Sequence, residues 1–129
     1  MKTLIFTLLL SAFTYANSSI EVNIHNKITK VSQEDLVRLY LKKSNTINGI
    51  KVIPLDTKNR ELFKEFYQKI IQKTPKQLHA YWMKEIYRGD KQPPKKLSQK
   101  ELKKITKQKV AVMTYEKNPK TGQILITIK

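Results

Sequence analysis

The sequence predicts an α/β fold in which a small mixed sheet is covered by helices. Three observations lead to this prediction. Segments with strand character occur near both ends of the chain, at residues 20–24, 110–115 and 124–128. Between them, several segments place apolar residues at helical spacing. Most of these helical segments also begin with a capping sequence. The predicted element order is βαβαααββ, which fits a single layered domain.

The first half of the chain supplies two predicted strands and one helix. Ile20-Glu21-Val22-Asn23-Ile24 alternates strictly, as a half-buried strand does. Ser32 can cap the helix that follows, and the acidic residues after it suit the positive end of the helix dipole. Asn48-Gly49 forms a turn into a second strand at 50–53, which we expect Pro54 to end.

Three more helices are predicted before the final strand pair. The helix at 59–72 has the strongest amphipathic pattern, with apolar columns formed by Leu62, Phe63, Phe66, Tyr67, Ile70 and Ile71. Thr74-Pro75 with Gln77 opens the next helix, whose expected buried residues are Leu78, Tyr81, Trp82, Ile86 and Tyr87. Ser98 and Glu101 form the capping box of a short helix that buries Leu102 and Ile105.

Arg88-Gly89-Asp90 admits two interpretations, an adhesion tripeptide or the end of a helix. Arg88 belongs to the predicted last helical turn, and Gly89 is suited to a left-handed stop. Pro93-Pro94 then stiffens the corner, whereas adhesion requires an exposed, flexible loop tip. The sequence therefore favours a structural corner.

Residues 1–16 have the features of a cleaved signal peptide. Met1-Lys2 is positively charged, Leu4–Leu10 is apolar apart from Thr7, and Tyr15-Ala16 offers a small residue at the cleavage site. The chain contains no cysteine for lipid attachment or disulfides. We therefore expect a periplasmic or secreted protein whose residues 17–129 form one domain.

The chain is strongly basic, with a formal net charge of +16, which loss of Lys2 lowers by one. Such a charge favours anionic partners. Only Arg38, Arg60 and Arg88 are arginines, however, and dedicated phosphate sites favour arginine over lysine. A lysine-rich surface is also typical of solvated faces, so both interpretations stay open.

Three stretches, VSQEDLVRLYLKK, VIPLDTKNRELFKEFYQKII and QLHAYWMKEIYRGDKQPP, follow one another at 31–43, 52–71 and 77–94. Their order and spacing resemble the short, single-domain relatives of the phosphate ABC transporter substrate-binding protein. The resemblance covers nearly all of residues 17–129. It implies one lobe of a type 2 periplasmic-binding-protein-like fold.

The resemblance also implies an oxyanion site at the turn from the second strand into the helix at 59–72. The residues at this turn are Thr57, Lys58, Asn59 and Arg60. Free amides and a positive dipole at a helix N-terminus suit an anion. The other interpretation of this segment, starting at Asp56, is an ordinary N-cap followed by solvated charges. Each of the three glycines has a predicted turn role, so none remains for a phosphate-cradling loop.

A second basic region lies toward the C-terminus, at Lys95, Lys96, Lys100, Lys103, Lys104 and Lys107. It is interpreted either as a solvated face or as a docking surface for an acidic protein or an anionic membrane. Nucleic acid is not an expected partner, because the aromatic residues belong to buried helix faces and are not interleaved with the basic ones.

No catalytic, metal or cofactor motif is evident. His25 and His79 are the only histidines and have no carboxylate or cysteine at ligand spacing. We therefore expect a non-enzymatic protein that needs no cofactor, and the resemblance implies a solute-binding-like protein that binds phosphate or a related oxyanion weakly. A homodimer or a partner would complete the cleft of a single lobe. The alternative function is a degenerate lobe that acts as a basic interaction protein.

Overall fold

The computed structural model describes residues 20–24, 31–89, 91–105, 111–117 and 123–128. The predicted signal peptide at 1–16, the turn at 118–122, His25, Asp90 and Lys107 lie outside the described residues. In chain order the elements are β1 (Ile20–Ile24), α2 (Gln33–Tyr40), β2 (Thr46–Ile47), β3 (Ile50–Thr57), α3 (Arg60–Phe66), η2 (Tyr67–Ile71), α4 (Pro75–Arg88), β4 (Lys95–Leu97), α5 (Gln99–Ile105), β5 (Ala111–Lys117) and β6 (Gln123–Ile128).

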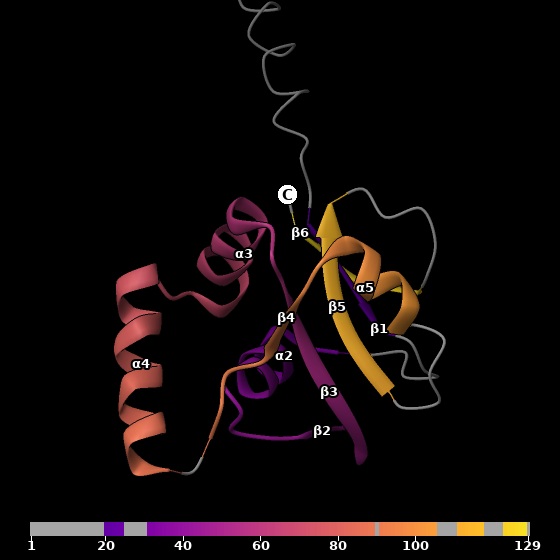
Figure 1. The fold of residues 1–129 in the computed structure, drawn as a ribbon. Coiled ribbons are helices and arrows are strands. Elements are labelled where there is room, and N and C mark those ends of the chain that lie inside the picture. The colour runs from indigo at the N-terminus through magenta and orange to yellow at the C-terminus, as the bar shows by residue number, and fades with distance from the viewer. Residues whose placement is uncertain (1–19, 25–30, 90, 106–110, 118–122, 129) are drawn as a thin grey trace, which may run out of the picture.

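The centre of the fold is an open, mixed sheet in the order β3-β5-β1-β6 (Figure 1). β3 and β5 are parallel, whereas β1 is antiparallel to both β5 and β6. The short strands β2 and β4 pair with the two ends of β3, antiparallel and parallel respectively. The predicted class, a small mixed sheet covered by helices, is confirmed, although β2 and β4 were not predicted.

Alternate residues of the central strands face two separate cores. Val52 of β3 and Met113 of β5 lie in the larger core, together with buried residues of α2, α3, η2 and α4. Leu55 and Val112, on the opposite side of the same strands, lie in a smaller core with Leu102 of α5. Helices therefore cover both faces of the sheet, and Figure 1 shows α2 behind it and α5 in front.

The prediction that Pro54 ends the second strand is wrong, because β3 continues to Thr57. Pro54 is the last residue of β3 that pairs with β5, and pairing with β4 begins at Leu55. A proline lacks the N–H of a ladder bond, so a position where the strand changes partners tolerates it. Asp56 and Thr57 therefore belong to a buried strand and not to a helix cap.

The helix starts agree closely with the sequence. Ser32 with Asp35, and Thr74 with Gln77, form reciprocal capping boxes. Ser98 and Glu101 exchange the same pair of hydrogen bonds at the start of α5. Asn48 and Gly49 both have positive φ, which matches the tight hairpin between β2 and β3. No helix in the described part of the chain is both long and apolar enough to cross a membrane.

One face of α4 differs from the prediction. Ile86 and Tyr87 were expected to be buried, but their exposed fractions are 41% and 92%, and that of Met83 is 54%. The buried residues of α4 are Leu78, Trp82 and Glu85. Because α4 stands at the edge of the molecule (Figure 1), only one narrow stripe of the helix contacts the body.

Gly89 ends α4 in the left-handed conformation, with φ of 79°, as predicted. Nothing lies within 4 Å of a Cβ added there, so a substitution would strain only the backbone. We expect Gly89→Ala to lower the free energy of unfolding by about 1 kcal/mol in urea titrations. Gly89→Asn should lower the free energy of unfolding by less, because asparagine tolerates this conformation. An alanine variant as stable as the parent would contradict the assignment.

Candidate functional site: a basic groove beside a buried carboxylate

A groove lies between α3, η2 and α4, with β4 along its side. It consists of two adjoining cavities of about 320 and 290 Å³, which we call the basic end and the apolar end. The two cavities share the residues Phe63, Tyr67, Pro75, Leu78 and Lys96. The groove thus has two adjoining halves with different chemistry.

The basic end collects cationic side chains from four parts of the chain: Lys58, Arg60, Lys64, Lys73 and Lys96. Among the described residues, no carboxylate lines this cavity. The Nζ of Lys58 lies 3.3 Å from Glu101, but both side chains are exposed and the pair is weak. Concentrating like charges around a concave surface makes it attractive to an anion.

Lys96 is positioned by an aromatic ring. Its Nζ lies 4.3 Å from the ring centroid of Phe63, which is a favourable cation–π geometry. Both residues border the two cavities. The Lys96 ammonium group therefore lies at the junction of the basic and apolar ends.

The four residues predicted for the oxyanion site do not all line the groove. Thr57, Lys58 and Arg60 line the basic end, whereas Asn59 is not among its lining residues. The Thr57 hydroxyl accepts a hydrogen bond from the Asn59 N–H at 3.1 Å. The Asn59 side chain accepts one from the Leu62 N–H at 3.1 Å. Asn59 is thus the N-cap of α3, and its side chain already accepts the hydrogen bond of one of the free amides.

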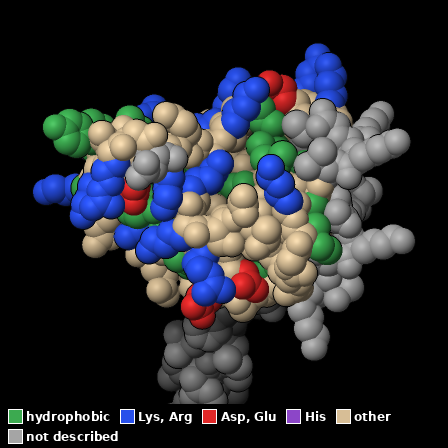
Figure 2. All heavy atoms as spheres, turned by 90° about the horizontal axis from the view of Figure 1, so that it is seen from below, with side chains coloured by type: hydrophobic (Ala, Val, Ile, Leu, Met, Phe, Trp, Pro, Cys, Tyr) green, Lys and Arg blue, Asp and Glu red, His purple; other side chains and the backbone are tan. Residues whose placement is uncertain are grey.

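The described lysines of the predicted basic surface are divided between β4 and α5. Lys95, Lys96, Lys100 and Lys104 are exposed, while the side chain of Lys103 and all of Lys107 lie outside the described residues. Of these, Lys96 borders the groove, and Lys100 and Lys104 belong to α5. On the face shown in Figure 2, the Lys and Arg side chains are scattered and do not form a band.

Asp56 is a buried carboxylate at the wall of the apolar end, with an exposed fraction of 2%. The Tyr67 hydroxyl lies 3.1 and 2.9 Å from its two oxygens, and the Tyr115 hydroxyl donates to Oδ1 at 2.8 Å. Burial raises the pKa of Asp56 to about 7. The hydrogen bonds from Tyr115 and Tyr67 and the charges of Lys96 and Lys42 lower this pKa, but the effect of burial is larger.

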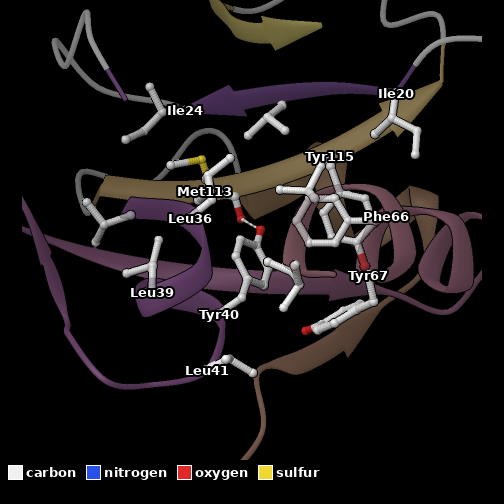
Figure 3. Packing of buried hydrophobic residues seen from close by; sticks show 14 of the residues in the cluster. Ile20, Ile24, Leu36, Leu39, Tyr40, Leu41, Phe66, Tyr67, Met113 and Tyr115 are labelled. Carbon is white, nitrogen blue, oxygen red and sulfur yellow. Dashed lines mark hydrogen bonds between the residues drawn. The ribbon is translucent and has the colours of Figure 1, made fainter. Parts of the chain in front are cut away.

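The tyrosines around Asp56 act as hydrogen-bond donors. Burial raises the pKa of Tyr40, Tyr67 and Tyr115 above the usual tyrosine value, so their hydroxyls stay protonated. The Tyr40 hydroxyl donates to the carbonyl oxygens of Leu55 and Met113, at 3.1 and 3.2 Å. Figure 3 shows Tyr40, Tyr67 and Tyr115 gathered around Phe66 in the larger core. This network fixes the Tyr67 side chain at the groove wall.

A local irregularity brings Tyr67 and Lys73 to the same cavity. The helix begun by α3 widens into the π-helical turn η2, and Gln72 then takes the left-handed conformation with φ of 62°. The Lys73 N–H donates back to the Tyr67 carbonyl at 3.1 Å. A left-handed residue other than glycine stores about 1 kcal/mol of strain, and π turns occur frequently at functional sites.

Sequence reasoning missed Lys64, Tyr67 and Lys73 as groove residues. The pattern predicted one regular helix ending at Gln72, with Tyr67 as an ordinary core residue. Nothing in the local sequence signals the π turn, because Gln72 is not a glycine. Lys64 and Tyr67 are one helical turn apart, and the hydrogen bond from the Lys73 N–H to the Tyr67 carbonyl keeps Lys73 beside them.

Comparison with known proteins yields no family model, no curated protein and no solved structure that matches this chain. Within the described ranges, no three His, Asp, Glu or Cys side chains are grouped so as to hold a metal ion. His79 borders the apolar end of the groove. The site must therefore be interpreted from its own geometry.

Proposed function

We propose that this protein is an exported, non-enzymatic, solute-binding-like protein of the phosphate ABC transporter substrate-binding type, and that its basic groove binds phosphate or a related oxyanion. The observation that carries the proposal is the cluster of five cationic side chains around one cavity. Export is proposed from the signal-peptide features of residues 1–16.

The geometry favours weak binding by the isolated chain. The cations are mostly long lysine side chains, which lose rotamer freedom when they hold an anion. The groove is also open to water, which competes for both partners. A dissociation constant on the order of 1 mM is expected. A second copy or another protein that covers the groove would exclude water and strengthen the interaction, as the missing lobe of a two-lobed binding protein would.

Isothermal titration with inorganic phosphate and sulfate tests the proposal. Lys73→Gln and Arg60→Gln should each weaken binding by about three- to tenfold, because each removes one charge from the basic end. Lys100→Gln, on α5, is the matched control and should leave binding unchanged. The proposal fails if no binding is detected at millimolar phosphate, or if the control variant loses as much affinity as the groove variants.

A second candidate function rests on the outer face of α4. Met83, Ile86 and Tyr87 are exposed there, next to Lys84 and Arg88 in the sequence. This combination suits the alternative role, a basic interaction protein for an acidic envelope partner or a membrane surface. Vesicles containing anionic lipid, and a polyglutamate resin, should retain the protein at low salt and release it at high salt. Retention that is independent of salt would contradict a charge-based surface.

A further inference from the structure

We infer that the ligand of the groove is an organic anion that carries a flat, uncharged ring, in preference to a bare inorganic ion. This inference rests on the proposed function, because it assumes that the basic end holds the charged group. It adds that the apolar end holds the uncharged ring of the same ligand.

The groove is larger than an inorganic ion requires. Its basic end alone measures about 320 Å³, and the apolar end adjoins it across a shared wall. Cavities of roughly 300–1,000 Å³ are typical of sites for small organic molecules. An inorganic oxyanion in contact with two or three of the cations would leave most of the groove filled with water.

Flat apolar side chains line much of the apolar end. Trp82, Pro93 and Pro94 border this cavity and not the basic end. The rings of Phe63 and Tyr67, whose centroids are 4.6 Å apart, form part of the wall shared by both cavities. Aromatic and proline side chains offer flat apolar surfaces, against which a ring stacks favourably. An ion without an apolar part gains nothing from such a surface.

The two ends of the groove meet at Lys96 and Phe63. Lys96 borders both cavities and its ammonium group lies over the Phe63 ring. An anionic group held by Lys96 would therefore place an attached ring beside Phe63, at the opening of the apolar end.

Charge then limits what the apolar end accepts. Asp56 borders this cavity, and its two oxygens already receive hydrogen bonds from Tyr67 and Tyr115. A second anionic group placed there would be repelled by the ionised form of this carboxyl group, and His79 and Lys96 are the other polar side chains, besides Tyr67, that border this cavity. The part of the ligand in the apolar end is therefore uncharged, which disfavours long polyanions.

Trp82 gives a direct readout, since it is the only tryptophan of the chain and borders the apolar end. Phenyl phosphate and benzoate should change its fluorescence. Each probe is compared with the ion that lacks the ring: phenyl phosphate with inorganic phosphate, and benzoate with acetate. The probe that binds better should bind at least tenfold more tightly than its reference ion. Neutral benzyl alcohol should bind far more weakly. The phosphate and carboxylate probes identify which charged group the basic end prefers.

Two variants separate the halves of the groove. Lys73→Gln should weaken both phenyl phosphate and inorganic phosphate, whereas Phe63→Leu should reduce mainly the advantage of phenyl phosphate. Comparing the ligands on the unaltered protein keeps the test valid even if Phe63→Leu is unstable. If phosphate and phenyl phosphate bind equally and Lys73→Gln weakens both, this inference is overturned while the proposed function stands. If neither anion binds, both fail.

Discussion

Replacing Phe66 by alanine is expected to lower the free energy of unfolding by about 3–5 kcal/mol. The Phe66 side chain is completely buried, and its ring stacks on that of Tyr115 with centroids 3.6 Å apart (Figure 3). The Tyr40 ring meets it edge-on at 4.9 Å. Removing the ring leaves a cavity and also deprives both tyrosines of their contact with Phe66.

Urea titrations monitored by circular dichroism would measure this loss. Tyr87→Ala is the matched control, because Tyr87 is an aromatic residue with an exposed fraction of 92%. The control should change stability by less than about 0.5 kcal/mol. Since domains of this kind are stable by roughly 5–15 kcal/mol, the Phe66 variant is expected to be marginally folded. A loss below about 1.5 kcal/mol would show that Phe66 is not central to the core.

The second large effect concerns the pH dependence of stability through Asp56. In the folded protein its pKa is about 7, above the ordinary value of 3.8. The folded state therefore binds this proton more tightly than the unfolded state does. The resulting stabilisation is present below about pH 4 and is lost as the pH rises toward 7. A difference of this size corresponds to about 4 kcal/mol at most.

Asp56→Asn isolates this contribution, because the variant keeps every other titrating group. Its amide oxygen can still accept from Tyr67 and Tyr115, but the side chain no longer titrates. Midpoints of urea unfolding, measured for both proteins from pH 4 to 7.5, should show the parent losing stability relative to the variant as the pH rises. Parallel pH profiles would mean that Asp56 has an ordinary pKa.

Much of the fold could be predicted from local sequence. The caps at Ser32, Thr74 and Ser98 depend on residues three positions apart, so they are visible without tertiary information. β2 and β4 are two and three residues long and exist because they pair with β3. A pairing partner distant in the sequence leaves no periodic signal in such short segments, so these strands could not be predicted.

Some predictions were wrong because contacts with distant parts of the chain outweighed a local sequence preference. Pro54 is an unfavourable strand residue in isolation, yet the change of partner in β3 accommodates it. The extension of the strand then buries Asp56, which the sequence had placed near a helix start. For α4, helical spacing indicated an apolar face wider than the stripe that actually meets the body, which left Tyr87 exposed.

The candidate site was accessible to sequence reasoning only in part. The segment Thr57–Arg60 contributes three residues to the basic end, and it was identified from the resemblance. Lys64 lies one helical turn after Arg60 on α3, whereas Lys73 follows η2 and Lys96 belongs to β4, which meets the segment by pairing with β3. The chain is rich in lysine, so the sequence could not distinguish the lysines of the groove from those that are only solvated.

The central claim is that the basic groove, and not the lysine surface in general, binds an anion. The most direct measurement is a two-dimensional NMR titration of the labelled protein with inorganic phosphate, which follows each backbone amide. We predict saturable shifts concentrated at Lys58, Arg60, Lys73 and Lys96, with one shared dissociation constant. Shifts of similar size at Lys100 and Lys104 on α5, growing without saturation, would contradict the claim and indicate diffuse attraction to a charged surface.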